Sequence, residues 1–171
     1  MNKLLLTKKK TILVGVEGDD DKLFLEHLRK LYLTSNALFR PIILNTRGGS
    51  PVKAIIRTIK KRSTEDFEYT YVIIDSDRTE DLSEAKKIAK LENIKLILLE
   101  PLCLDCMLLS ILEKRGLSTT AMCKSILKKF CGDDPFNVTN LATHFPKKLL
   151  DKRRKNVPSL NQLIYLFTGT F

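Results

Sequence analysis

The chain begins with a regular alternation of short apolar runs and longer amphipathic segments. Four short apolar runs, several rich in β-branched residues, predict β-strands: 11–16, 40–44, 69–75 and 94–99. Three segments between them place apolar residues at helical spacing and predict helices: 20–33, 51–62 and 80–92. This order predicts an α/β fold with a mostly parallel four-stranded sheet flanked by helices.

Two of the predicted helices carry local start signals. Asp19 or Asp20 is expected to cap the N-terminus of the first helix. The segment 47–50 is typical of a turn and ends in Ser50, which fits an N-cap because Pro51 follows at the first helical position.

The last third of the chain lacks strand-like runs. Three segments predict helices with no strand between them: 104–115, 118–131 and 158–167. The prolines and lysines of 133–157 leave that stretch without a clear assignment. We therefore predict a single domain over 1–171, with an α/β core at 11–100 and a helical, basic appendage at 101–171.

The charge of the chain points to a polyanionic partner. The net charge is +10, which favours nucleic acid or an acidic membrane as a partner, with solubility alone as the alternative. Residues 124–155 hold nine Lys or Arg against three Asp or Glu. The run Lys152-Arg153-Arg154-Lys155 within them is either a phosphate-contact patch or a solvated charge run.

The sequence predicts neither a secretory leader nor a membrane span. Three leucines at 4–6 are too few for a leader, and charged residues and a proline interrupt the longest apolar stretch, 94–112. We expect a cytoplasmic protein without membrane association, whose four cysteines are reduced. Cys103 and Cys106 lack further ligands at zinc spacing, so we expect them to be small core residues.

Candidate chemistry lies where two predicted strands end. Glu17 follows the strand at 11–16, and Asp75 and Asp77 end the strand at 69–75. Ligands of open α/β sheets gather at this edge, and residues two apart on a strand share a face. Three such carboxylates would repel one another unless a divalent cation is bound by their oxygens. The alternatives are a plain strand-to-helix turn at Glu17 and a polar loop that begins at Asp75.

These residues resemble a known signature. Val16-Glu17-Gly18 with Asp75-Ser76-Asp77 is similar to the Toprim signature of topoisomerases, bacterial primases, overcoming-lysogenization-defect nucleases and rRNA-maturation ribonucleases. The segment 17–22, Glu-Gly-Asp-Asp-Asp-Lys, resembles the Glu-Gly-x-x-Glu/Asp-Lys form of the nuclease branches. The resemblance covers about residues 11–110.

Two further segments resemble the RloB-like branch: 48–51, Gly-Gly-Ser-Pro, and 101–109, Pro-Leu-Cys-Leu-Asp-Cys-Met-Leu-Leu. That branch has a Pro-Cys-Phe-Glu-x-Trp-Leu-Leu-like segment after its fourth strand, which places Asp105 at its acidic position. Leu104 and Met107 stand where that segment has Phe and Trp.

The resemblance implies roles for individual residues. Glu17, Asp75 and Asp77 would be ligands of Mg²⁺ or Mn²⁺, and Glu17 would also move a proton. Asp21 and Asp105 would be further catalytic acids. The alternatives are a favourable charge on the first helical turn for Asp21 and a helix cap at 106–115 for Asp105.

Arg78 follows the Asp75–Asp77 pair in the sequence. It would contact phosphate, or else be a solvated arginine.

The function implied is a Mg²⁺- or Mn²⁺-dependent nuclease acting on DNA or RNA, in defence against phage or mobile elements. A separate ATPase is an expected partner, because such families often pair with one and this chain has no Gly-x-x-x-x-Gly-Lys-Ser/Thr loop. One alternative is a non-catalytic module that binds nucleic acid or a partner. The other is nucleotidyl transfer at a primase-like site, for which the sequence has no triphosphate-binding motif.

Overall fold

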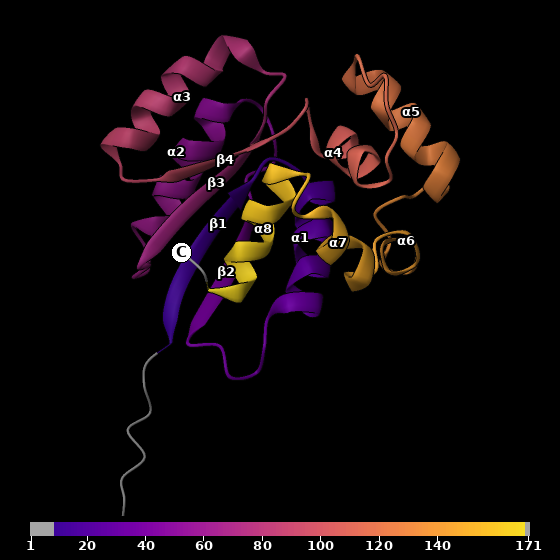
Figure 1. The fold of residues 1–171 in the computed structure, drawn as a ribbon. Coiled ribbons are helices and arrows are strands. Elements are labelled where there is room, and N and C mark those ends of the chain that lie inside the picture. The colour runs from indigo at the N-terminus through magenta and orange to yellow at the C-terminus, as the bar shows by residue number, and fades with distance from the viewer. Residues whose placement is uncertain (1–8, 170–171) are drawn as a thin grey trace, which may run out of the picture.

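The architecture is an α/β sandwich around one parallel sheet (Figure 1). The computed structural model describes residues 9–169, apart from the side chain of Glu80. The predicted absence of a leader concerns residues 1–8, which lie outside the described residues. Four strands pair in the order β2-β1-β3-β4, all parallel, which confirms the predicted fold class. Their bounds are β1 Lys10–Val16, β2 Phe39–Asn45, β3 Tyr69–Asp75 and β4 Lys95–Leu99.

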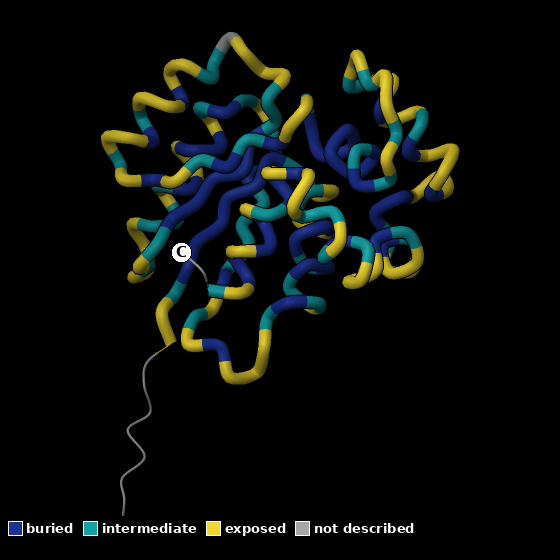
Figure 2. The backbone as a smooth tube through the Cα atoms, viewed as in Figure 1, coloured by how far each residue is buried: buried dark blue, intermediate teal, exposed yellow. Residues whose placement is uncertain are grey.

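Side-chain alternation along the central strands divides the core into two clusters. On β3, Tyr71 and Ile73 belong to one cluster, and Val72 and Ile74 belong to the other. Successive side chains of a strand point to opposite faces, so a parallel sheet covered on both sides needs apolar residues at every position. Figure 2 shows the central strands buried along most of their length.

Helices cover both faces of the sheet. One face carries α2 and α3, and the other carries α1 and α8 (Figure 1). The bounds of these helices are α1 Asp19–Tyr32, α2 Pro51–Arg62, α3 Thr79–Leu91 and α8 Pro158–Thr168. Helix α8, which lies in the segment predicted as the helical appendage, packs with its apolar side against α1 and β4. The reason is that this face of the sheet needs a second helix to exclude water.

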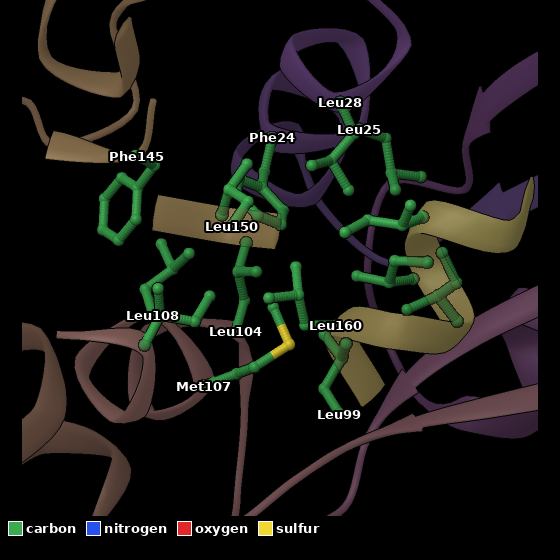
Figure 3. Packing of buried hydrophobic residues seen from close by; sticks show 14 of the residues in the cluster. Phe24, Leu25, Leu28, Leu99, Leu104, Met107, Leu108, Phe145, Leu150 and Leu160 are labelled. Carbon is green, nitrogen blue, oxygen red and sulfur yellow. The ribbon is translucent and has the colours of Figure 1, made fainter. Parts of the chain in front are cut away.

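The remaining helices extend the α1 side of the molecule. Their bounds are α4 Leu104–Ile111, α5 Thr120–Cys131, α6 Val138–His144 and α7 Lys147–Arg153. Figure 3 shows Phe24, Leu25 and Leu28 of α1 in one apolar cluster with side chains of α4, among them Leu104, Met107 and Leu108. Helix α4 is buried on nearly every side, so this region shares its apolar core with the sheet.

The cysteine prediction was wrong in part. Cys106 of α4 and Cys123 of α5 form a disulfide, whereas Cys103 and Cys131 are free and buried. Reduced thiols were expected because a cytoplasmic location was expected. The packing of α4 beside α5, which brings Cys106 and Cys123 together, has no local signal in the sequence.

The two helix-start predictions had different outcomes. Ser50 caps α2 by accepting a hydrogen bond from the Lys53 backbone N–H, as predicted. For α1 the cap is Gly18 rather than an aspartate. Asp21 at the third helical position accepts a hydrogen bond from the Gly18 N–H at 2.9 Å, the return half of a capping box.

No helix among residues 9–169 combines the length and apolarity needed to cross a membrane.

Close packing of α2 on β1 depends on Gly15. A Cβ at this position would overlap the hydroxyl of Thr58, which donates a hydrogen bond to the Ala54 carbonyl.

We expect Gly15→Ala to lower the free energy of unfolding by about 1–3 kcal/mol, because the surrounding core must shift to make room for the added methyl group. Urea denaturation measures this loss. Gly15→Ala/Thr58→Ala should recover part of it, and additive losses in the double variant would contradict the explanation.

Candidate functional site

A cavity of about 430 Å³ opens at the carboxyl edge of the sheet. The ends of β1 and β3 meet there with the first turns of α1 and α4 and with one residue of α5. The side chains and backbone that line it are Glu17, Gly18, Asp19, Asp20, Asp21, Gly48, Asp75, Arg78, Leu104, Asp105 and Lys124. The structure thus brings together Glu17, Asp21, Asp75, Arg78 and Asp105, five of the residues singled out from the sequence.

Glu17 lies at the base of this site. It directly follows β1 and is 8% exposed. Its Oε1 accepts a hydrogen bond from the Asp75 N–H at 3.4 Å, and the Arg78 Nε lies 3.9 Å from its Oε2. Burial raises the pKa of Glu17, and the Arg78 charge works against that rise. Glu17 therefore joins the two strand ends through one carboxylate.

Asp75 is the last residue of β3 and points into the same cavity. Burial, followed by the charges of Asp21, Glu17 and Asp77, raises its pKa to about 8. Burial likewise raises the pKa of Asp21 to about 7, with Glu17 adding to the effect and the Gly18 N–H opposing it. At neutral pH both carboxyls are protonated to a large extent, so a divalent cation bound here would displace protons and offset the repulsion between the charged forms.

Asp77 lies beside the cavity. Because β3 ends at Asp75, strand alternation does not extend to Asp77, and the predicted shared face is absent. Asp77 lines a neighbouring cavity of about 420 Å³ and accepts a hydrogen bond from the Thr120 hydroxyl. Arg78 lines both cavities. Asp77 is nevertheless close enough for its charge to raise the pKa values of Asp75 and Glu17.

Asp105 reaches the site from the first turn of α4. The helix is capped at Cys103, so Asp105 is not its N-cap. The carboxyl is buried, and burial raises its pKa while the ammonium of Lys124 opposes the rise. Asp105 is thus a buried carboxyl of the cavity wall, and the alternative of a helix cap is wrong.

Lys124 and Lys128 of α5 are site residues that the sequence analysis missed. Lys124 lines the cavity, and both lysines act against the rise in the pKa of Asp20 and of Asp105. The disulfide between Cys106 and Cys123 joins the residues next to Asp105 and Lys124 in the chain. The C-terminal charge surplus was visible in the sequence, but only the packing of α5 on α4 shows which lysines face the carboxylates.

The predicted basic run divides into two parts. Arg153 pairs with Glu113 and is largely buried, and the Arg154 Nε donates to the Asn161 Oδ1 at 2.8 Å. Lys152 and Lys155 are exposed. Two of the four proposed phosphate contacts thus have intramolecular partners.

The cavity has side chains of the kind that bind a divalent cation, but they are not arranged as a set of metal ligands. Among the residues that the structure describes, no group of three or more His, Cys, Asp or Glu side chains is arranged to hold a metal ion. The carboxylates that line the cavity are oxygen donors of the kind that Mg²⁺ and Mn²⁺ prefer, and the pKa values of Asp75 and Asp21 are raised by burial first and by neighbouring carboxylates second. Glu17 and Asp75 both line the cavity and are joined by the hydrogen bond from the Asp75 N–H.

Comparison with known proteins gave no match. No protein-family model, curated protein or solved structure matches the chain. The Toprim resemblance therefore rests on the residues quoted above.

The buried carboxyls predict how stability depends on pH. The pKa values of Asp21 and Asp75 are both raised in the folded protein. The protonated carboxyls therefore stabilise the fold, and this stabilisation is lost as pH rises from about 4 through 7 for Asp21 and 8 for Asp75. In EDTA at pH 8–9, Asp75→Asn should therefore raise the unfolding free energy by about 1–2 kcal/mol, or the Tm by roughly 2–8 °C.

Thermal denaturation from pH 4 to 9 measures this effect, and the gain should fade toward pH 4. Asp66→Asn, at an exposed position, is the matched control and should follow the wild type. An Asp75→Asn variant that is less stable at every pH would contradict the assignment.

Proposed function

We propose that this chain is a divalent-metal-dependent nuclease with a Toprim-like core. The observation that supports it is the cavity at the carboxyl edge of the sheet that is lined by Glu17, Asp21, Asp75 and Asp105 together with the cationic side chains of Arg78 and Lys124. Phosphodiester hydrolysis needs both charges: carboxylates for a metal ion and cations for the phosphate oxygens.

The residues divide into two groups by their surroundings. Glu17 and Asp75 would hold Mg²⁺ or Mn²⁺, with Asp77 joining from the neighbouring cavity. The metal ion would supply Lewis acidity and an activated water when bound. The Arg78 Nε lies 3.9 Å from the Glu17 Oε2, and its Nη1 donates to the Gly49 carbonyl at 3.1 Å, which leaves the Nη2 donors for a phosphate. Lys124 would contact phosphate from the α5 side.

Asp21 is suited to proton transfer. Its pKa of about 7 leaves it partly protonated at neutral pH, and a group with a pKa near the working pH is an efficient acid or base. The Gly18 N–H fixes one of its oxygens at 2.9 Å, which holds the carboxyl in place.

A second candidate function is a binding module without catalysis, completed by a partner. The observation that favours it is the hydrogen bond from Thr120 to Asp77, which occupies one oxygen of a proposed ligand. A separate ATPase partner and a role in defence against phage or mobile DNA are proposals drawn from the resemblance to the RloB-like and overcoming-lysogenization-defect branches, and a cytoplasmic location is a separate proposal. Nucleotidyl transfer is less well supported, because the sequence has no triphosphate-binding motif.

Cleavage assays test the nuclease proposal. With plasmid DNA and total RNA as substrates, Mg²⁺ or Mn²⁺ should start cleavage by the wild type. The Glu17→Gln/Asp75→Asn/Asp77→Asn variant should cleave at least about 100-fold more slowly, because each substitution removes a metal-binding charge.

The matched control removes the same charge elsewhere. Asp66→Asn/Glu84→Gln/Asp133→Asn changes three exposed carboxylates and should cleave like the wild type. Equal activity of the site variant and this control would rule the proposed site out. Metal-dependent stabilisation of the wild type without cleavage would favour the partner-dependent module.

A further inference from the structure

A second cavity, of about 480 Å³, lies between the end of β2 and the outer face of α2. We call it the α2 basic cavity; its lining residues are Leu44, Asn45, Thr46, Arg47, Arg57, Lys60, Lys61 and Thr64. Four of these carry positive charge and none carries negative charge. Arg57, Lys60, Lys61 and Thr64 follow the i, i+3, i+4, i+7 spacing that places residues on one helix face.

The wall of this cavity is anchored by Arg57. Its Nη1 donates to the Thr46 carbonyl and, at 2.8 Å, to the Gly48 carbonyl. A guanidinium has five N–H donors in a fixed fork, so the donors on Nη2 and Nε can serve a ligand while Nη1 holds the loop. Arg57 thus ties the 46–48 loop to α2 and brings a fixed charge to the cavity.

The other three cationic side chains of the cavity are accessible to a bound ligand. Arg47 and Lys60 are exposed, and Lys61 pairs with Glu65 on the surface. A surface pair of this kind contributes little, so a phosphate could displace Glu65 at small cost. The α2 cations span about 6 Å of helix axis, with Arg47 on the loop side, which suits several linked phosphates better than one isolated ion.

The 45–48 loop separates this cavity from the acidic one. Gly48 lines the acidic cavity, and its N–H donates to the Glu17 carbonyl at 2.6 Å. Asn45 lines the basic cavity, and its Nδ2 donates to Oδ1 of Asp19 at 2.6 Å. Asp19 in turn lines the acidic cavity. The two cavities therefore share one wall, and a polymer chain bound across it would contact both.

We propose that the α2 basic cavity binds backbone phosphates of a nucleic-acid strand next to the phosphate held at the acidic cavity. The inference rests on the proposed function for the identity of the polymer. The lining contains no aromatic residue on which a base could stack, so recognition would be of the backbone and independent of base sequence.

Binding in EDTA tests the inference without requiring cleavage. The probes are a fluorescein-labelled 20-nucleotide single strand and the matching duplex, measured by anisotropy between 50 and 200 mM KCl. Arg47→Gln/Lys60→Gln/Lys61→Gln leaves the anchoring Arg57 unchanged. It should weaken binding about 10-fold or more and lower the salt-dependence slope by about 2, as expected when two or three phosphate contacts are lost.

The control is Lys86→Gln/Lys87→Gln/Lys90→Gln, which removes three exposed charges from α3. It should change the affinity less than about twofold, and circular dichroism should show both variants folded. Equal weakening by the two variants would mean that only total charge matters and would overturn the inference. So would loss of binding to anionic phospholipid vesicles with unchanged affinity for both nucleic acids.

The two proposals fail separately. If the cavity variant loses binding while the wild type cleaves nothing, the basic cavity stands and the nuclease proposal falls. If cleavage depends on Glu17, Asp75 and Asp77 but binding is unaffected in the cavity variant, the nuclease stands and the basic cavity is refuted.

Discussion

The structure depends on a parallel sheet that must be buried on both faces. The backbone of β1 pairs with β2 and β3, and its side chains meet helices on either side, so no position near its end can face water cheaply. Gly15 is where this constraint is tightest, because Thr58 of α2 packs against the strand there. Two residues later the chain leaves the sheet with Glu17. The packing that buries β1 therefore also places the Glu17 carboxylate where little water can reach it.

This arrangement destabilises the charged forms of the carboxylates at the sheet edge. Asp75 and Asp21 have pKa values of about 8 and 7 because burial and mutual repulsion both disfavour their charged forms. Arg78 and Lys124 offset part of that cost, and a divalent cation would offset more. Clusters of carboxyls with pKa values raised in this way are typical of functional sites, where stability is lost in favour of chemistry.

Positive charge surrounds this acidic centre on several sides. Helix α5 places Lys124 on the cavity wall, the loop after β3 places Arg78 there, and α2 holds a basic cavity behind the 45–48 loop. The disulfide between Cys106 and Cys123 joins α5 to α4, which also carries Asp105. Helices α4 and α5 are therefore part of the site, and α4 to α8 all contribute residues to the core.

The strands and helices of the first hundred residues followed from the sequence alone, because hydrophobic period and turn residues are local signals. The strand–helix order also predicted that Glu17 and Asp75 would meet, since parallel strands end at a common edge. Other features needed the tertiary structure. The end of β3 at Asp75 turned Asp77 toward Thr120, and the packing of α5 on α4 brought Lys124 to the cavity and joined two cysteines. Helix α8 took its place on the sheet because the face beside α1 had to be covered. These outcomes depend on contacts between residues far apart in the chain, which no local pattern encodes.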